Sequence, residues 1–125
     1  MSEQAIKKVL ITGANGFIGG SLMRYYQNQG QDVVGVDLVG NGDDIVEGDI
    51  SQPDSISQLL TESDVIIHTA ALVSNAMQDL DMWRVNVLAT RNLMQAAKKH
   101  KVRRFVQISS IVRSEEHTSE LQSLG

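Results

Sequence analysis

Three glycines spaced three residues apart stand between an apolar run and an amphipathic segment near the start of the chain. Residues 9–11 form the run, Thr12 ends it, and Gly13, Gly16 and Gly19 follow. This spacing predicts a strand that turns sharply into a helix, which directs backbone N–H groups and the helix N-terminus at one point. Such a turn binds the pyrophosphate of a dinucleotide. Because a glycine triplet alone is weak support for this function, the rest of the sequence has to provide the context.

An acidic residue follows at the distance that dinucleotide binding requires. Asp37 stands near the end of the next strand pattern, residues 32–38, and lies 18 residues after Gly19. A carboxylate at this place accepts hydrogen bonds from both hydroxyls of an adenosine ribose and repels a 2′-phosphate. We therefore expect NAD as the cofactor in preference to NADP.

Strand and helix patterns alternate along the chain, which predicts a scaffold for these residues: a parallel sheet with helices on both faces. We expect an α/β fold, a Rossmann-type doubly wound parallel sheet with strand order 3-2-1-4-5, truncated after the fifth strand. The expected strands are residues 8–12, 32–37, 45–47, 65–69 and 104–109, and the expected helices are residues 16–29, 53–61 and 81–99.

The longest expected helix carries two groups of side chains that have structural explanations. An apolar stripe with roughly helical spacing is assigned to the core. A basic cluster around His100 is assigned to the solvated helix end, where cations offset the helix dipole, in preference to a phosphate or nucleic-acid patch. The stripe is Val85, Leu88, Leu93, Met94 and Ala97, and the cluster is Lys98, Lys99, Lys101, Arg103 and Arg104.

Length and composition exclude several classes of function. The 125 residues correspond to one domain, and the net charge of −4 argues against a general nucleic-acid binder. The chain has no cysteine, which excludes disulfides and thiolate metal sites and fits a reducing compartment. No apolar run approaches the roughly 18 residues that span a membrane, and the start has no secretion signal. We expect a cytoplasmic protein with no metal site, membrane segment or nucleic-acid partner.

The motif at residues 12–19 resembles the TGxxGxxG signature of the extended short-chain dehydrogenase/reductase family. Further matches follow along residues 7–112: the Asp-containing turn at 48–50, the family's His-x-Ala-Ala at 68–71, and the Asn-containing helix at 85–93. The resemblance implies NAD contacts from twelve residues. They are Gly13, Gly16, Phe17, Ile18, Gly19, Asp37, Asp49, Ile50, Ala70, Ala71, Asn86 and Ser109.

Three of the matched positions also have a purely structural explanation. By resemblance Asp49 meets the adenine amino group, but an aspartate there can equally end a strand in a turn. By resemblance, Asn86 lies near the cofactor ribose or organises the active site. The alternative is an asparagine that bonds the backbone at a helix irregularity. We assign His68 no catalytic role, because a single histidine without partners at ligand or triad spacing is usually a buried structural residue.

The chemistry implied by the resemblance needs residues at the end of the fifth strand. Ligands bind outside the carboxyl ends of the strands in such sheets, and the family's catalytic Ser/Thr aligns with Ser110. The family's Tyr-x-x-x-Lys pair is absent, because tyrosine occurs only at positions 25 and 26 and no lysine follows position 101. The resemblance thus implies the NAD-binding part of an epimerase, dehydratase or dehydrogenase that transfers hydride at a substrate carbinol carbon. We expect a small-molecule substrate and a homodimeric parent enzyme, and no activity from this fragment itself.

The last residues do not continue the pattern of the fold. Residues 113–123 resemble the translation of a sequencing adapter, the alternative being a natural polar tail. We expect residues 1–112 to be an incomplete NAD(P)-binding domain and residues 113–125 to be a non-native tail. Two other functions stay open: a non-catalytic dinucleotide-binding regulatory module, and a flavin- or NADP-using Rossmann protein of another family.

Overall fold

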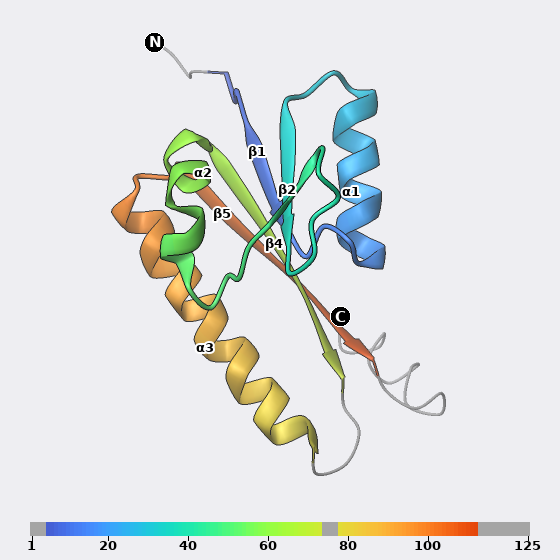
Figure 1. Ribbon diagram of the computed structural model, residues 1–125, viewed down its shortest axis with the longest axis vertical. Coiled ribbons are helices and arrows are strands. Elements are labelled where there is room, and N and C mark those ends of the chain that lie inside the picture. The colour runs from blue at the N-terminus through green and yellow to red at the C-terminus, as the bar shows by residue number, and fades with distance from the viewer. Residues whose placement is uncertain (1–4, 74–77, 113–125) are drawn as a thin grey trace.

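Five parallel strands form the centre of the protein, in the order β3-β2-β1-β4-β5 (Figure 1). The computed structural model describes residues 5–73 and 78–112, without the side chains of residues 70–73, 78–83, 85 and 109–112. The sheet confirms the expected fold class and strand order. The strands are β1 (Val9–Thr12), β2 (Val33–Asp37), β3 (Ile45–Glu47), β4 (Val65–Val73) and β5 (Arg104–Val112).

Helices connect the strands on both faces of the sheet. Pro53 begins a short 3₁₀ turn that passes directly into a helix, so the segment expected as one helix has two parts. Proline suits this first turn because the N–H that it lacks would have no partner there. The elements are α1 (Phe17–Asn28), η1 (Pro53–Ile56), α2 (Ser57–Glu62) and α3 (Gln78–Lys99).

The two longest strands extend beyond the ends that the sequence predicts. β4 continues four residues past Thr69, and β5 continues three residues past Ser109. The two strands pair with each other over this whole stretch, up to Val73 and Val112. Alanine and serine have weak strand preference, so pairing between distant segments, and not local sequence, decides where these strands end.

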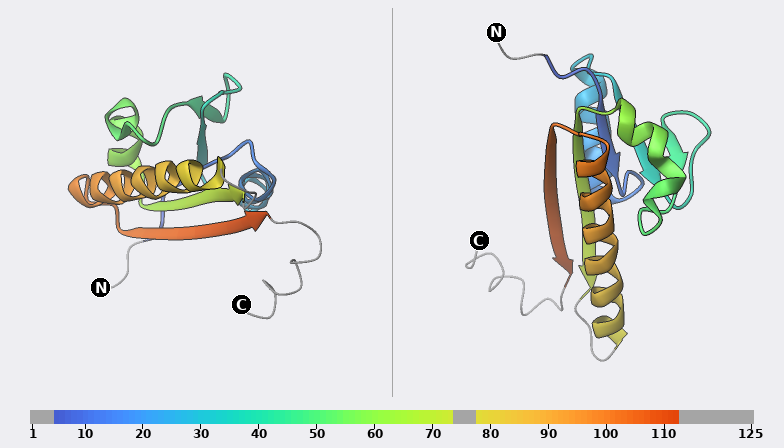
Figure 2. Two further views of the ribbon diagram at one scale, coloured as in Figure 1. Left: turned by 90° about the horizontal axis from the view of Figure 1, so that it is seen from below. Right: turned by 90° about the vertical axis from the view of Figure 1, so that its left-hand side faces the viewer.

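Two apolar clusters pack on opposite faces of the sheet. On one face, Met23 of α1 packs against Val9 and Ile11 of β1. On the other, Leu60 of α2 and Leu93 of α3 pack against the neighbouring strands, and Figure 2 shows both helices on the same side of the sheet. Successive strand residues point to opposite faces, so the apolar residues 9–11 of β1 serve both clusters.

The predicted core stripe of α3 is wrong at two positions. Leu88 and Met94 are 51% and 49% exposed. The buried line consists of Ala89, Leu93 and Ala97, each one turn after the last, while the side chain of Val85 lies outside the described residues. The two small alanines let the helix lie close to the sheet, so the face that they occupy is buried in preference to the bulkier one.

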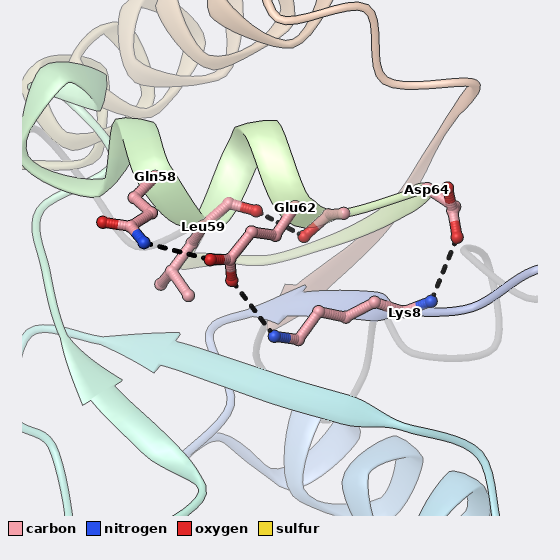
Figure 3. Close-up of polar contacts among 6 residues, drawn as sticks. Lys8, Gln58, Leu59, Glu62 and Asp64 are labelled. Carbon is pink, nitrogen blue, oxygen red and sulfur yellow. Dashed lines mark hydrogen bonds and ion pairs between the residues drawn. The ribbon is translucent and has the colours of Figure 1, made fainter.

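A group of polar contacts ties the amino edge of the sheet together (Figure 3). The Asp64 carboxylate accepts hydrogen bonds from the backbone N–H groups of Lys7 and Lys8, at 2.6 and 3.1 Å. These bonds, that of Lys7 above all, lower the pKa of Asp64. The ammonium of Lys8 lies 3.2 Å from Glu62, which also accepts a bond from Gln58 at 3.1 Å. These contacts lie at the edge opposite the carboxyl ends of the strands.

Candidate dinucleotide-binding site

Two of the three glycine positions in the turn after β1 accept no residue other than glycine. Gly13 has φ +67°, and a Cβ there would lie 2.8 Å from the carbonyl oxygen of Thr69. A Cβ on Gly19 would overlap the carbonyl oxygen of Gly13 and lie 2.8 Å from its carbonyl carbon. Both obstacles are backbone atoms, which cannot rotate away as a side chain can. Gly16 is less constrained, since a Cβ there would lie 3.3 Å from the Gly13 oxygen.

The turn leads directly into the N-terminus of α1. Gly16 is the N-cap, with extended backbone, and it makes no side-chain capping bond. The first helical bond runs from the Gly20 N–H to the Gly16 carbonyl at 2.8 Å, so the amides of Phe17, Ile18 and Gly19 precede the intrahelical ladder. The first turn carries no acidic residue. This end of the helix is thus suited to an anion, because the N–H groups and the helix dipole act in the same direction.

Asp37 lies against this turn, as its place in the sequence predicts. Its Oδ2 accepts a hydrogen bond from the backbone N–H of Asn15 at 2.9 Å, and its Oδ1 accepts one from Leu38 at 2.8 Å. The side chain is half-buried at the end of β2. A carboxylate has about four lone-pair sites, so two bonds leave capacity for ribose hydroxyls.

Asn15 is a residue of this site that the sequence reasoning missed. Its side-chain amide donates to the carbonyl of Val39 at 2.6 Å, which ties the glycine turn to the loop after β2. The local pattern, an asparagine between two turn glycines, predicts a side chain that bonds the backbone, but its partner lies 24 residues further along the chain.

The Asp49 carboxylate closes a turn after β3. Its Oδ1 accepts hydrogen bonds from the hydroxyl and the backbone N–H of Ser51, at 2.7 and 3.0 Å. The hydroxyl bond is the main cause of the lowered pKa of Asp49. The structural explanation of this residue therefore holds, and a contact with adenine stays a prediction. Ile50, beside it, is half-buried against the cluster that contains Leu60.

His68 is buried where β4 passes the end of β1. It is 1% exposed, its Nδ1 lies 2.5 Å from Thr12 Oγ1, and its Nε2 lies 2.9 Å from Thr90 Oγ1. Burial lowers its pKa from 6.5 to about 4, so the ring is neutral at pH 7. These contacts agree with the expected structural role. Asn86 lies half-buried on α3, one turn before Thr90.

The backbones of the remaining predicted site residues on β4 and β5 lie together at the same edge of the sheet. Ala70 pairs with Ser109 and Ala71 with Ser110, just beyond the pairing of Thr12 with His68. The side chains of these two alanines and two serines lie outside the described residues, so their roles stay predictions.

A cavity of about 340 Å³ borders the turn between α1 and the loop after β2. Its polar lining includes Asp44, which accepts hydrogen bonds from Asn41 at 2.6 Å and Gln27 at 2.5 Å. These bonds, that of Asn41 first, lower the pKa of Asp44. The carboxylate therefore serves the structure of the loop.

Searches for two other kinds of site gave no candidate in the described parts of the chain. Within residues 5–73 and 78–112, no three His, Asp or Glu side chains come together in a way that could hold a metal ion. The helices of that same part are too short or too polar to cross a bilayer.

Comparison with known proteins places this turn in a family. The family model of NAD-dependent epimerases and dehydratases matches residues 9–121. The chain belongs to this family. The match confirms the expected relationship, and at the level of the family it confirms the NAD dependence.

Several proteins similar to this chain are much longer than it. A sterol demethylase protein B of Methylococcus capsulatus is 36% identical over 112 residues, which are 81% of this chain and 34% of that protein. An NAD-bound short-chain dehydrogenase/reductase from Agrobacterium tumefaciens is 34% identical with TM-score 0.69, covering 80% of this chain and 31% of that one. WbmH of Bordetella bronchiseptica, solved with NAD⁺, is 33% identical with TM-score 0.62, covering 81% and 38%. The chain spans about a third of the length of the curated relatives that it matches.

Proposed function

We propose that this chain binds NAD at the carboxyl edge of its sheet. The pyrophosphate would lie at the N-terminus of α1, and Asp37 would accept hydrogen bonds from the adenosine ribose. The observation that carries the proposal is the position of the Asp37 carboxylate against the glycine turn, 2.9 Å from the amide of Asn15. The residues fit the cofactor, because the turn leads into a helix N-terminus whose first amides precede the intrahelical ladder and whose first turn carries no acidic residue.

The other matched positions complete the proposed cofactor site. The turn after β3 would receive the adenine, and the carboxyl ends of β4 and β5, together with α3, would hold the nicotinamide half. In these roles we propose Gly16, Phe17, Ile18, Asp49, Ile50, Ala70, Ala71, Asn86 and Ser109, with Ser110 as the catalytic residue that holds the substrate alcohol.

We further propose that the chain is the cofactor-binding part of a cytoplasmic oxidoreductase. Bound NAD would accept hydride from the carbinol carbon of a small-molecule substrate, and the parent enzyme would be a homodimer. In the boundaries that we propose, residues 1–112 belong to this domain and residues 113–125 do not.

For the chain as it stands, binding without turnover is the favoured activity. The sequence has tyrosine only at positions 25 and 26, and Tyr25 is 57% exposed on α1. The Tyr-x-x-x-Lys pair of the family thus has no counterpart here. Reduction of NAD by this chain with any alcohol would contradict this part of the proposal.

Calorimetric titration with NAD and NADP tests the cofactor site. Asp37→Ala is expected to weaken NAD binding about tenfold or more, because it removes a charged acceptor, and to improve NADP binding. Asp32→Ala is the matched control, since Asp32 is an exposed acid just before the amino end of the same strand. Unchanged affinity for both cofactors in Asp37→Ala would remove Asp37 from the site.

A further inference from the structure

His68 joins three elements of the fold through its two ring nitrogens. It lies on β4, its Nδ1 contacts Thr12 at the end of β1, and its Nε2 contacts Thr90 on α3. The ring of Phe105 on β5 lies tilted beside it, with ring centres 6.1 Å apart. Thr12 directly precedes Gly13, so this bridge ends at the first residue of the glycine turn.

We propose that His68 is a positioning residue of the cofactor site, which fixes the glycine turn to α3 through the bridge Thr12–His68–Thr90. The proposal rests on the NAD-binding function proposed above and goes beyond it. It assigns a role to a residue that is not among the proposed cofactor contacts: His68 would align the glycine turn and α3, the two parts that hold NAD.

The turn is held from β4 on both faces of the sheet. Successive residues of a strand point to opposite faces. His68 contacts the side chain of Thr12, while Thr69 donates its hydroxyl to the carbonyl of Thr12 at 2.8 Å. The same hydroxyl lies 3.4 Å from the carbonyl of Gly13. The position of the turn is therefore set by β4, and His68 connects the end of β1 to α3.

The burial of the two threonines decides which ring nitrogen carries the proton. Thr12 is fully buried, and Nδ1 of His68 is the acceptor that the described residues offer to its hydroxyl hydrogen, since a buried donor without an acceptor is costly. The neutral ring then carries its hydrogen on Nε2 and donates it to Thr90. The hydroxyl of Thr90 is only half-buried and can direct its own hydrogen elsewhere.

The helical end of the bridge lies beside a proposed cofactor contact. Asn86 and Thr90 are four residues apart on α3, so they lie on the same face of the helix. A cofactor that contacts both the turn and Asn86 needs the two at a fixed separation. Loss of the bridge should therefore weaken NAD binding even in a protein that stays folded.

Two substitutions of Thr90 and one matched control test this inference in the full 125-residue chain. Thr90→Val leaves the Nε2 hydrogen without an acceptor and is expected to weaken NAD binding about fivefold to tenfold. Thr90→Ser keeps the hydroxyl and is expected to bind within about twofold of the original chain. Thr61→Val is the control, because it removes another Thr–His contact, 2.8 Å to His100, far from the turn, and should leave NAD binding unchanged.

Two measurements separate failure of the bridge from failure of the NAD proposal, because neither needs the cofactor. In ¹⁵N-labelled histidine spectra, His68 is expected to carry its hydrogen on Nε2. In hydrogen exchange, the amides of Ala14 and Gly16 should exchange faster in Thr90→Val than in the original chain and in Thr61→Val. A hydrogen on Nδ1, or equal exchange and equal NAD affinity in the two valine variants, would overturn the inference. If Thr90→Val does not fold, the tautomer and the Thr90→Ser variant decide.

Discussion

Lowering the pH from 7 to 5 should weaken the fold through one buried histidine. The pKa of His68 falls from 6.5 in the unfolded chain to about 4 in the folded protein, because burial disfavours the charged ring. Between these two values the unfolded chain binds a proton that the folded protein does not bind. The unfolding free energy is therefore highest above pH 6.5 and is lost progressively as the pH falls toward 4.

The size of the effect follows from the two pKa values. One pKa unit corresponds to about 1.36 kcal/mol. At pH 5, the proton's preference for the unfolded chain corresponds to about 1.5 pKa units, so it lowers the unfolding free energy by about 2 kcal/mol. The carboxylates with lowered pKa, such as Asp44, Asp49 and Asp64, add losses mainly at lower pH, around and below their ordinary value of 3.8. At pH 5 and above, the loss therefore comes mainly from the histidine.

Urea unfolding at pH 7, 6 and 5 measures this loss directly. His68→Gln is expected to flatten the dependence on pH, because its side chain does not titrate, whatever its stability at pH 7. His100→Gln, the control, removes a histidine that is less buried than His68 and should keep most of the slope. The reasoning would be refuted by equal unfolding free energies at pH 7 and 5, or by the same slope in His68→Gln.

Two further pairs of substitutions test the backbone geometry. Gly19→Ala forces the carbonyl of Gly13 aside and should weaken NAD binding about tenfold or more. Gly20→Ala should leave NAD binding within about twofold, since a Cβ there would meet no atom closer than 3.5 Å. Calorimetry measures both affinities, and equal loss in the two variants would contradict the geometry. Lys101 has φ 62° just after α3, so Lys101→Gly should raise the unfolding free energy by about 0.5–1 kcal/mol. Lys99→Gly, at the last residue of the helix, should lower it by up to about 1 kcal/mol. Urea unfolding of both lysine variants measures this, and a destabilised Lys101→Gly would count against relief of strain at that residue.

The parts of the site that the sequence predicted are those with local causes. The glycine spacing dictates the turn after β1, because Gly13 has φ +67° and the carbonyl of Gly13 occupies the space of a side chain at Gly19. The distance to Asp37 follows from one helix and one strand, so its place beside the turn could be predicted as well. Asp49 shows the limit, since a turn-closing aspartate and an adenine contact have the same sequence pattern.

The parts that the sequence did not predict depend on contacts between distant segments. The partners of His68 are 56 residues before it and 22 after it, and no periodicity reports such distances. The face that α3 buries was misassigned at Leu88 and Met94, because helical spacing alone allows several stripes and close packing of two alanines selects one. The ends of β4 and β5 likewise depend on their mutual pairing.

The most direct test of NAD binding at the glycine turn is a titration followed by amide NMR. In the ¹⁵N-labelled chain, NAD is expected to shift the amides of Phe17, Ile18 and Gly19 in a saturable way, together with that of Asn15 beside Asp37. Saturable shifts at these amides would place the pyrophosphate at the N-terminus of α1. No shift at millimolar NAD, or shifts confined to other parts of the chain, would contradict the proposed site.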